Sequence, residues 1–332
     1  MSVIRTAPAR TALIRTVLGD IDPASLGRVN AHEHLFQVSP LLPGDELDDA
    51  QRSADEAASL RDSGFDAMID ATPIGLGRRP GEVAAISAAT GLRVVASTGI
   101  HREAHYPAEH PLRALDVEAR AALFIRDLRD GMPASDDAPV DAGAPASTAD
   151  GTSAPVRAGL IKTGIGYWSI SRFERATLEA AAVAHAATGA AIMVHLEHGT
   201  AAHEVLDLLA SLGVRPERVM LAHADRLLDV GHHVELLERG ASLGYDGCAR
   251  WKDRSDEELL TLTGAVVDRG HDRILLGGDV ARASRYVAYG GMPGLAYLGD
   301  RYLPRLRARI GDAAVERMLV QHPRALLTLS AR

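Results

Sequence analysis

Apolar residues gather in eight short runs along the chain, and longer stretches of mixed apolar and polar positions separate these runs. The runs cover Gly27–Leu35, Phe65–Thr72, Leu92–Gly99, Ala158–Thr163, Ala190–Glu197, Arg218–Asp225, Ala241–Asp246 and Arg273–Asp279. Near-continuous apolar runs of this kind are typical of strands in a parallel sheet that is covered on both faces. The pattern therefore predicts eight buried β-strands.

The stretches between the runs predict helices. Amphipathic segments rich in alanine and leucine occupy Phe173–Thr188, Ala201–Leu212, Leu227–Arg239 and Asp256–Arg269, and a further helix is expected over Pro111–Arg129. Several of these segments are followed by glycine, the usual helix stop, at Gly189, Gly213, Gly240 and Gly270. Eight strands that alternate with helices predict an α/β fold, the (β/α)8 or TIM barrel, whose active site lies at the C-terminal ends of the strands.

The whole chain, residues 1–332, is expected to form one barrel domain. Its 332 residues exceed the roughly 250 typical of this fold but lie within the fold's range, and 46% hydrophobic content suits a large core. One segment, Gly131–Pro155, is rich in Pro, Ala, Ser, Asp and Gly and has almost no large apolar residue. We expect it to be a solvated, mobile loop inserted within the domain, because a boundary there would leave neither half with a closed sheet.

Charge and cysteine content narrow the partners and the compartment. A formal net charge of −8 and a pI near 6.0 argue against nucleic acid or an anionic membrane as the main partner. The one cysteine, Cys248, excludes an intrachain disulfide and fits a reducing compartment. The N-terminal segment has no uninterrupted apolar stretch typical of a signal peptide, and no segment approaches 18 apolar residues. We expect a cytoplasmic protein with a small-molecule substrate, and the oligomeric state stays open, a homodimer included.

Two histidines one residue apart, His32 and His34, close the first apolar run. Side chains alternate along a strand, so both imidazoles point to the same side and Glu33 points to the other. Imidazoles that converge on one point usually share a metal ion, although histidine pairs also occur on solvated strand faces. Further metal-binding side chains at the ends of other runs favour the metal: Lys162, His195, His223 and Asp279.

Several motifs occur in a fixed order on these runs. They are T-V-L-G at Thr16–Gly19, V-N-A-H-E-H-L at Val29–Leu35, R-A-G-L-I-K at Arg157–Lys162, V-H at Val194–His195, L-A-H-A-D at Leu221–Asp225 and G-G-D at Gly277–Asp279. Over about residues 11 to 329 the chain resembles the phosphotriesterase family of the amidohydrolase superfamily. It departs from the family mainly in the Gly131–Pro155 insert and at Gln321-His322-Pro323, where relatives often carry Asn before the Pro. Neither departure touches a ligand position.

The resemblance implies a binuclear metal centre. His32, His34 and Asp279 would hold the more buried ion, and His195 and His223 the more exposed one. Lys162 would bridge the two ions after N6-carboxylation, since an ammonium cannot bind a cation whereas a carbamate is a bidentate anion. Zinc is the default for these ligands, with Mn, Co and Fe as alternatives. A water polarised by two cations would become a hydroxide, and Asp279, the catalytic residue, would pass its proton to the leaving group.

Some of these residues also have plain structural interpretations. A lysine at the end of a strand is usually exposed, and only the ordered set of other ligands favours carboxylation of Lys162. Asp70 and Asp225 also end strands, where a structural cap is as good an explanation as a catalytic role. Five further histidines fall on predicted helices or their first residues and are expected at the surface: His185, His198, His203, His232 and His233.

Cations crowd the loops that follow the last two runs. Arg250 and Lys252 follow the seventh run, and Arg282 and Arg285, with Tyr286 next to them, follow the eighth. Any one of them would be explained by a solvated loop, but together they indicate an anion site, since Arg binds phosphate bidentately and Lys adds a point charge. The segment resembles the family's phosphorylated sugar-lactone hydrolases, in which Lys252 and Arg282 match phosphate ligands and a Tyr near Arg285 or Tyr286 matches the third.

The sequence therefore predicts a metal-dependent hydrolase that opens a lactone, one that carries a remote phosphate. Organophosphate triesters and simple carboxylic esters are alternative substrates, although neutral substrates would not need the cationic residues. A non-catalytic barrel that binds metal or a phosphate ligand is an alternative of another class. The complete set of six ligands argues against it, because binding alone requires neither a bridging hydroxide nor Asp279.

Overall fold

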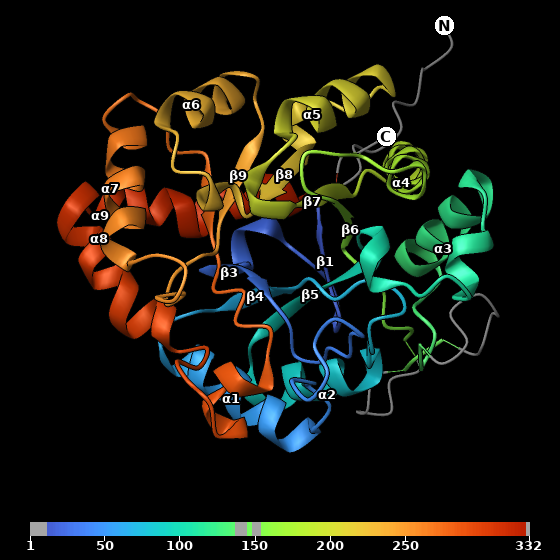
Figure 1. Cartoon of the computed structure of the whole chain (residues 1–332). Helices are drawn as coiled ribbons and strands as arrows, with labels where there is room; N and C mark the ends of the chain where they lie inside the picture. The colour runs from blue at the N-terminus through green and yellow to red at the C-terminus, as the bar shows by residue number, and fades with distance from the viewer. Residues whose placement is uncertain (1–11, 137–144, 148–153, 330–332) are drawn as a thin grey trace, which may run out of the picture.

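Eight parallel strands form a single sheet that curls into a barrel in the computed structural model, which describes residues 12–136, 145–147 and 154–329 (Figure 1). Each strand pairs with the next along the chain, in the order β3 to β10. The strands are β3 (Val29–Glu33), β4 (Ala67–Asp70), β5 (Arg93–Gly99), β6 (Leu160–Ile165), β7 (Ala191–Leu196), β8 (Val219–Ala222), β9 (Ser242–Tyr245) and β10 (Ile274–Leu276). Each lies within one of the eight predicted runs or overlaps it, and the predicted TIM barrel is confirmed.

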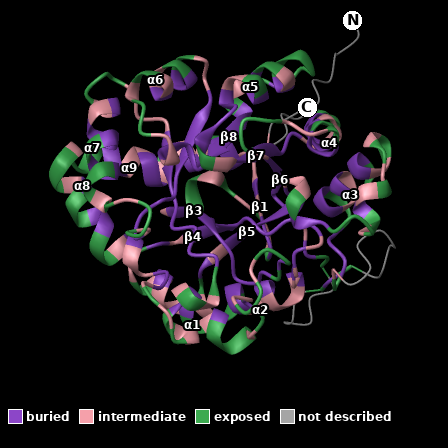
Figure 2. Cartoon of the chain, in the orientation of Figure 1, coloured by how far each residue is buried: buried purple, intermediate pink, exposed green. Residues whose placement is uncertain are grey.

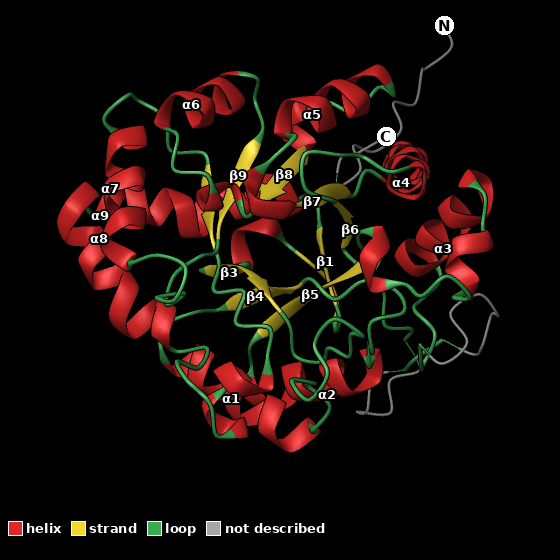
Figure 3. Ribbon diagram, viewed as in Figure 1, coloured by secondary structure: helices red, strands yellow, loops and turns green. Residues whose placement is uncertain are grey.

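Helices surround the sheet (Figure 3). They are α1 (Ala50–Asp62), α2 (Pro80–Thr90), α3 (Val117–Arg129), α4 (Arg172–Thr188), α5 (Ala202–Ser211), α6 (Val230–Glu238), α7 (Asp256–Val267), α8 (Leu303–Ile310), α9 (Asp312–Glu316) and α10 (His322–Leu327). Before the barrel, β1 (Ile14–Thr16) and β2 (Gly19–Ile21) form an antiparallel hairpin. No helix in the described part of the chain is long and apolar enough to cross a membrane.

Local capping sets the helix limits. Ser171 and Glu174 form a capping box at the start of α4, and Gly189 ends this helix with a positive φ of 77°. The single helix predicted over Pro111–Arg129 is wrong, because Pro111–Ala114 form a separate 3₁₀ turn and α3 begins only at Val117. The carboxylate of Asp116 accepts a hydrogen bond from the Ala119 N–H, which fixes the start of α3 at this point.

The core has two layers. Val29, Ala31 and Leu160 belong to a cluster of buried side chains from alternate strand positions, and this cluster fills the barrel interior. The neighbouring position Ile161 belongs to a second cluster, which packs the outside of the strands against helices through residues such as Leu178. Figure 2 shows the resulting pattern, with buried strands inside and exposed positions on the outer faces of the helices. The two layers explain why the strand runs are nearly continuously apolar.

The described parts of the Gly131–Pro155 insert are packed at its base. The Met132 N–H donates to the Val156 carbonyl oxygen, and the Ala146 N–H donates to the Met132 carbonyl oxygen. Both Met132 and Ala146 are buried. The carboxylate of Asp136 accepts from the backbone N–H and the guanidinium of Arg78. The expectation of a solvated loop is therefore wrong for this base, and residues 137–144 and 148–153 lie outside the described residues.

Two of the five histidines expected at the surface are buried, and that expectation is wrong for them. His233 donates from Nε2 to the Ala224 carbonyl oxygen and accepts at Nδ1 from the Tyr245 hydroxyl. His185 lies against the Ala190 carbonyl oxygen, with 2.7 Å between Nδ1 and the oxygen. A histidine can be buried at little cost when its ring nitrogens have hydrogen-bond partners, and these partners lie outside the helix that carries each histidine.

The barrel closes between its first and last strands. The Asp279 N–H, just beyond β10, donates to the His32 carbonyl oxygen over 2.9 Å. Glycine is required at this closure because a Cβ on Gly277 would lie 2.8 Å from the His32 Cβ and 2.9 Å from its backbone nitrogen. A Cβ on Gly278 would lie 2.1 Å from Oε1 of Glu33. The two glycines therefore allow the backbone of His32 and that of Asp279 to approach each other.

We predict that Gly277→Ala destabilises the protein by about 1–3 kcal/mol, the usual cost of forcing extra atoms into a packed core. The free energy of unfolding from urea titrations measures the loss. Gly81→Ala is the matched control, because its new Cβ would meet only the Ser147 carbonyl oxygen, at 3.7 Å. Gly81 also lies in helix α2, where alanine is favoured over glycine. Equal stability of the two variants would show that the close approach at Gly277 does not limit the closure.

Candidate metal centre

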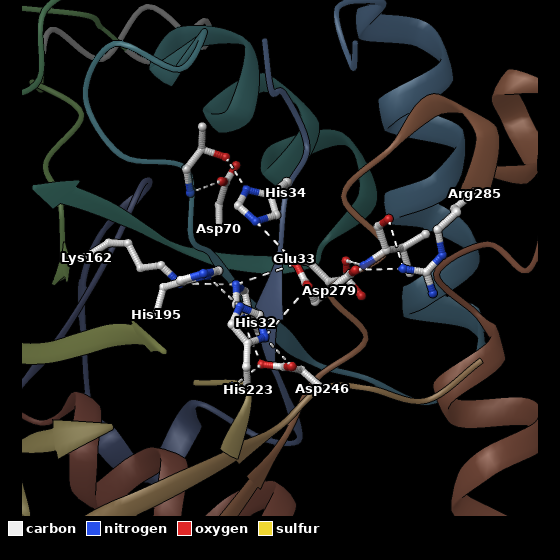
Figure 4. Close-up of polar contacts among 12 residues, drawn as sticks. His32, Glu33, His34, Asp70, Lys162, His195, His223, Asp246, Asp279 and Arg285 are labelled. Atoms are coloured by element: carbon white, nitrogen blue, oxygen red, sulfur yellow. Dashed lines mark hydrogen bonds and ion pairs between the residues drawn. The ribbon is translucent and has the colours of Figure 1, made fainter. Parts of the chain in front are cut away.

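A cavity of about 230 Å³ lies at the C-terminal ends of the barrel strands. Polar side chains from most of the strand ends line it, and they are His32, His34, Gln37, His101, Arg102, His105, His195, Glu197, His223, Arg226, Arg250, Asp279 and Arg282. Leu41, Leu42 and Ala281 complete the lining. Figure 4 shows the histidines, Lys162 and two aspartates pointing toward one another at this end of the barrel.

The first and last strands supply one group of donor atoms. The Nε2 atoms of His32 and His34 each lie 3.7 Å from Oδ1 of Asp279. These two histidines therefore converge, as the alternation of β3 predicts. Glu33 points away from the pair, and its carboxylate accepts from the Val280 N–H and from the Asn30 side-chain amide.

Strands β6, β7 and β8 supply the second group. Lys162 lies on β6 with its Nζ 3.2 Å from Nε2 of His32. His195 lies on β7, and His223 follows β8 in the left-handed conformation, with φ of 64°. The Nδ1 atom of His195 lies 2.8 Å from Nε2 of His223. The structure thus brings all six sequence-predicted donors together in one site.

Each histidine of the site uses one ring nitrogen for an outer partner. Asp246 accepts from Nδ1 of both His32 and His223, over 2.8 Å and 2.6 Å. His34 donates from Nδ1 to the Thr72 hydroxyl oxygen, since that hydroxyl gives its own hydrogen to the Phe36 carbonyl oxygen. Glu197 accepts from Nε2 of His195 over 2.8 Å. These partners fix the tautomers and turn the lone pair of each remaining nitrogen into the cavity.

Burial keeps the site histidines neutral. It lowers the pKa of His34 to about 3 and the pKa values of His32, His195 and His223 below their ordinary value, and the neighbouring cationic groups contribute. Burial likewise lowers the pKa of Lys162 to about 8. Neutral imidazoles are the form that binds a metal ion.

The arrangement fits bound cations better than it fits the side chains alone. With their N–H groups committed to Glu197 and Asp246, His195 and His223 direct two lone pairs at each other across 2.8 Å. Two lone pairs at this distance repel unless a positive charge lies near both. His32, His34 and Asp279 likewise have the spacing of a metal-binding triad. The donor set is therefore of the kind that holds transition-metal ions.

Arginines surround the second oxygen of Asp279. Arg226 lies 3.2 Å from Oδ2, and Arg250 donates to Oδ2 and to the backbone carbonyl oxygen of the same residue. Burial opposes ionisation of this carboxyl, but the charge of Arg250 favours it, and the pKa of Asp279 lies well below its usual range. In this structure Asp279 is therefore a carboxylate with Oδ1 toward the histidines and Oδ2 toward the arginines.

The four predicted substrate residues have different places. Arg282 is exposed and lines the cavity. Lys252 is exposed on the loop after β9 and is not part of the lining. The Arg285 guanidinium donates to the carbonyl oxygens of Asp279 and Val280. The buried Tyr286 hydroxyl donates to the carbonyl oxygen of His34. The structure thus brings only Arg282 of the four to the cavity.

Sequence reasoning missed the residues that orient the donor histidines and several that line the cavity. Asp246, Thr72 and Glu197 hold the histidine rings, and Asp246 could have been found because it ends the seventh apolar run. His101 and His105 lie just after β5, and the His101 ring contacts that of His195 with 4.6 Å between ring centroids. Arg226 directly follows the L-A-H-A-D motif, so a position next to a strand end was its only signal.

Comparisons with known proteins agree with this geometry. The model of the phosphotriesterase family matches residues 12–327. A phospho-furanose lactonase of Mycoplasmopsis synoviae is 29% identical over 335 residues, which covers 96% of this chain and 92% of that protein. Among solved structures, the lactonase Lmo2620 of Listeria monocytogenes aligns with a TM-score of 0.84 at 28% identity, covering 96% of this chain and 99% of that one. The phosphotriesterase homology protein of Escherichia coli, complexed with phosphate in its active site, aligns with a TM-score of 0.79 at 28% identity, covering 92% and 100%.

We predict that Asp246→Asn weakens metal binding by about 10- to 100-fold, the usual cost of losing a partner behind a ligating histidine. An amide has one acceptor atom, so one of the two imidazoles would lose its carboxylate acceptor and its fixed tautomer. Competitive Zn²⁺ titration measures the affinity. Asp225→Asn is the matched control, since Asp225 is also buried at a strand end but accepts from the Gly247 N–H. If both variants bind metal equally, Asp246 does not orient the ligands.

Proposed function

Because the chain belongs to the phosphotriesterase family, whose members are hydrolases, we propose that it is a metal-dependent lactonase that opens a phosphorylated sugar lactone. One observation carries the proposal: five metal-binding side chains line a cavity that four arginines also line, and Lys162 lies beside them with its Nζ 3.2 Å from Nε2 of His32. The names of the compared proteins support it, since two are lactonases and one of these is named a phospho-furanose lactonase. The alternative of a non-catalytic barrel is not retained, because the family is one of enzymes.

We propose that the donors hold two divalent metal ions, with zinc as the default and Mn, Co and Fe as alternatives. His32, His34 and Asp279 would hold one ion, and His195 and His223 the other. Such a pair of cations acidifies a water molecule and polarises the carbonyl oxygen of an ester. The facing lone pairs of His195 and His223 support this assignment.

Lys162 would join the two groups of donors as a carbamate. Its side chain is 1% exposed, and burial lowers its pKa to about 8, so that an appreciable share of the amine is neutral near neutral pH. The neutral amine adds to CO2, forms an N–C bond and releases one proton. The resulting anion would then lie among cations, whereas an ammonium would lie beside the lone pair of His32 without being able to bind a metal ion.

Asp279 would move the proton during the reaction. Its Oδ1 is the oxygen nearest the ring nitrogens of His32 and His34, so it lies where an attacking water would lose its proton. The carboxylate would then deliver this proton to the oxygen of the lactone ring that leaves as the C–O bond breaks. Arg226 and Arg250 hold Oδ2, which keeps the carboxylate oriented while Oδ1 works.

The anion of the substrate would bind at the rim. Four guanidinium groups line the cavity, from Arg102, Arg226, Arg250 and Arg282, and two of them, Arg226 and Arg250, are committed to Asp279. We propose that Arg282 contacts the phosphate directly and that Lys252 is a second, more distant cation. Arg285 and Tyr286 would act indirectly by holding the loop of Arg282 through their backbone contacts.

Neutral triesters and simple esters are the alternative substrates. They carry no anion and would leave Arg282 without a partner, so a phosphorylated substrate explains the cavity better. The phosphate in the active site of the Escherichia coli relative also favours an anionic ligand. The cytoplasmic location and the homodimer stay predictions from the sequence.

We predict about two transition-metal ions per chain in active protein. Lys162 and Lys252 are the two lysines of the chain, which allows a direct assignment of the carbamate. Protein equilibrated with ¹³C-bicarbonate should show one carbamate carbon signal in the NMR spectrum. Lys162→Ala should lose this signal, most of the metal and nearly all activity, whereas Lys252→Ala should keep the signal.

Two outcomes would contradict parts of this centre. One metal ion or none in fully active protein, measured by elemental analysis, would reject the binuclear site. An unmodified Lys162 in protein that holds two ions would reject the carbamate alone.

We predict that Arg282→Met lowers kcat/KM for a phosphorylated lactone by roughly 10- to 150-fold, the effect of losing one charge-assisted hydrogen bond. The same variant should hydrolyse an uncharged lactone almost normally, because that substrate makes no contact with the rim. Lys252→Met should weaken use of the phosphorylated lactone less, since Lys252 lies outside the cavity. Equal losses on both substrates would make Arg282 structural, and a wild-type preference for neutral lactones or triesters would reject the phosphate.

A further inference from the structure

A second cluster of metal-binding side chains lies outside the barrel mouth, between helices α5 and α6. His203 is the second residue of α5, and His232 and Glu235 lie three positions apart on α6. One potential ligand atom from each residue lies within 4.8 Å of the other two. Figure 1 shows α5 and α6 as neighbours on the outside of the barrel.

The spacing of this cluster matches a tetrahedral site. Nε2 of His203 lies 3.3 Å from Oε2 of Glu235. Tetrahedral zinc with bonds of about 2.1 Å places its ligand atoms about 3.4 Å apart. The rings of His203 and His232 meet edge to face, with 5.1 Å between centroids. All three side chains can therefore face one ion without a change in the backbone.

An unsatisfied nitrogen points to a missing partner. Nε2 of His232 is buried and makes no hydrogen bond within the described residues. A buried polar atom without a partner is costly, and its presence in a folded protein asks for an explanation such as an ion.

We propose that His203, His232 and Glu235 bind one divalent transition-metal ion of the zinc class, apart from the barrel-mouth centre. Two imidazoles and one carboxylate supply three ligands, and water would occupy the fourth position because Glu235 is 66% exposed. The ion is structural: it joins α5 to α6. These helices follow the strand ends that carry His195 and His223.

Arg239 opposes binding of this ion, so its removal allows the direction of a change in metal affinity to be predicted and tested. Its Nη1 donates to Nδ1 of His203 over 3.0 Å, and its Nη2 binds Asp207 over 2.5 Å. This contact places the hydrogen of His203 on Nε2, the atom that would bind the metal. Metal binding moves the hydrogen to Nδ1 and breaks the Arg239 contact, and the guanidinium charge also repels the ion. Removal of Arg239 should therefore tighten metal binding.

The experiment is a Zn²⁺ titration of protein whose barrel-mouth centre is already loaded, in competition with a chromophoric chelator. Wild type should bind one further equivalent. His232→Ala and the exposed substitution Glu235→Gln should weaken this equivalent by about 10-fold or more, as loss of a partner at a zinc site does, while the hydrolytic activity stays. Arg239→Met should tighten it.

His271→Ala is the matched control. His271 is also partly exposed and lies 3.9 Å from a glutamate of α6, Glu238, but no second histidine of the described residues shares a metal-binding group with it. Its replacement should leave the titration unchanged. Absence of a further equivalent in wild type, its persistence in His232→Ala and Glu235→Gln, or weaker binding in Arg239→Met would each overturn the proposal.

Discussion

The carboxylate of Asp246 is the contact on which the rest of the site depends. It is fully buried after β9, and it accepts hydrogen bonds from the rings of His32 on β3 and His223 after β8 and from the backbone N–H of His223. Burial alone would neutralise it, but the hydrogen bond from His32 and the nearby charges hold its pKa below the ordinary value. One anion therefore orients a histidine from each group of donors, so that His32 and His223 share one outer partner.

This arrangement requires a closed barrel. His32 and Asp279 belong to the first and last strand ends, and they meet only because the Asp279 N–H reaches the His32 carbonyl oxygen. That approach needs a backbone without side chains at Gly277 and Gly278. The two glycines of the G-G-D motif thus meet a packing requirement, and the aspartate that follows them is the proposed metal ligand. The positive φ of Asp279, 40°, belongs to the same tight turn. The same backbone contact therefore closes the barrel and places Asp279 beside His32.

The sequence was sufficient for the fold and the donors because both obey local rules. The periodicity of apolar residues, the length of the apolar runs and the glycines after the helical segments predicted the strands and most helices. Parallel strands bring their C-terminal ends to one edge, so residues at these ends, such as Lys162 and His195, were expected to meet. The residues behind the donors could not be predicted, because Asp246 or Thr72 acquires its role from a partner far along the chain. The break before α3 depended on a cap at Asp116, a signal that the apolar periodicity of Pro111–Arg129 concealed.

The distribution of charge is the last determinant of what the cavity accepts. The chain carries a formal charge of −8, yet four arginines line the mouth and two of them are already shared with Asp279. The histidines are neutral, so they do not offset metal ions, and each divalent cation bound there would make the cavity more positive. A low-dielectric cleft of one sign concentrates ligands of the opposite sign. The four arginines in the lining of an acidic protein therefore support the proposal of an anionic substrate, with Arg282 as its proposed contact.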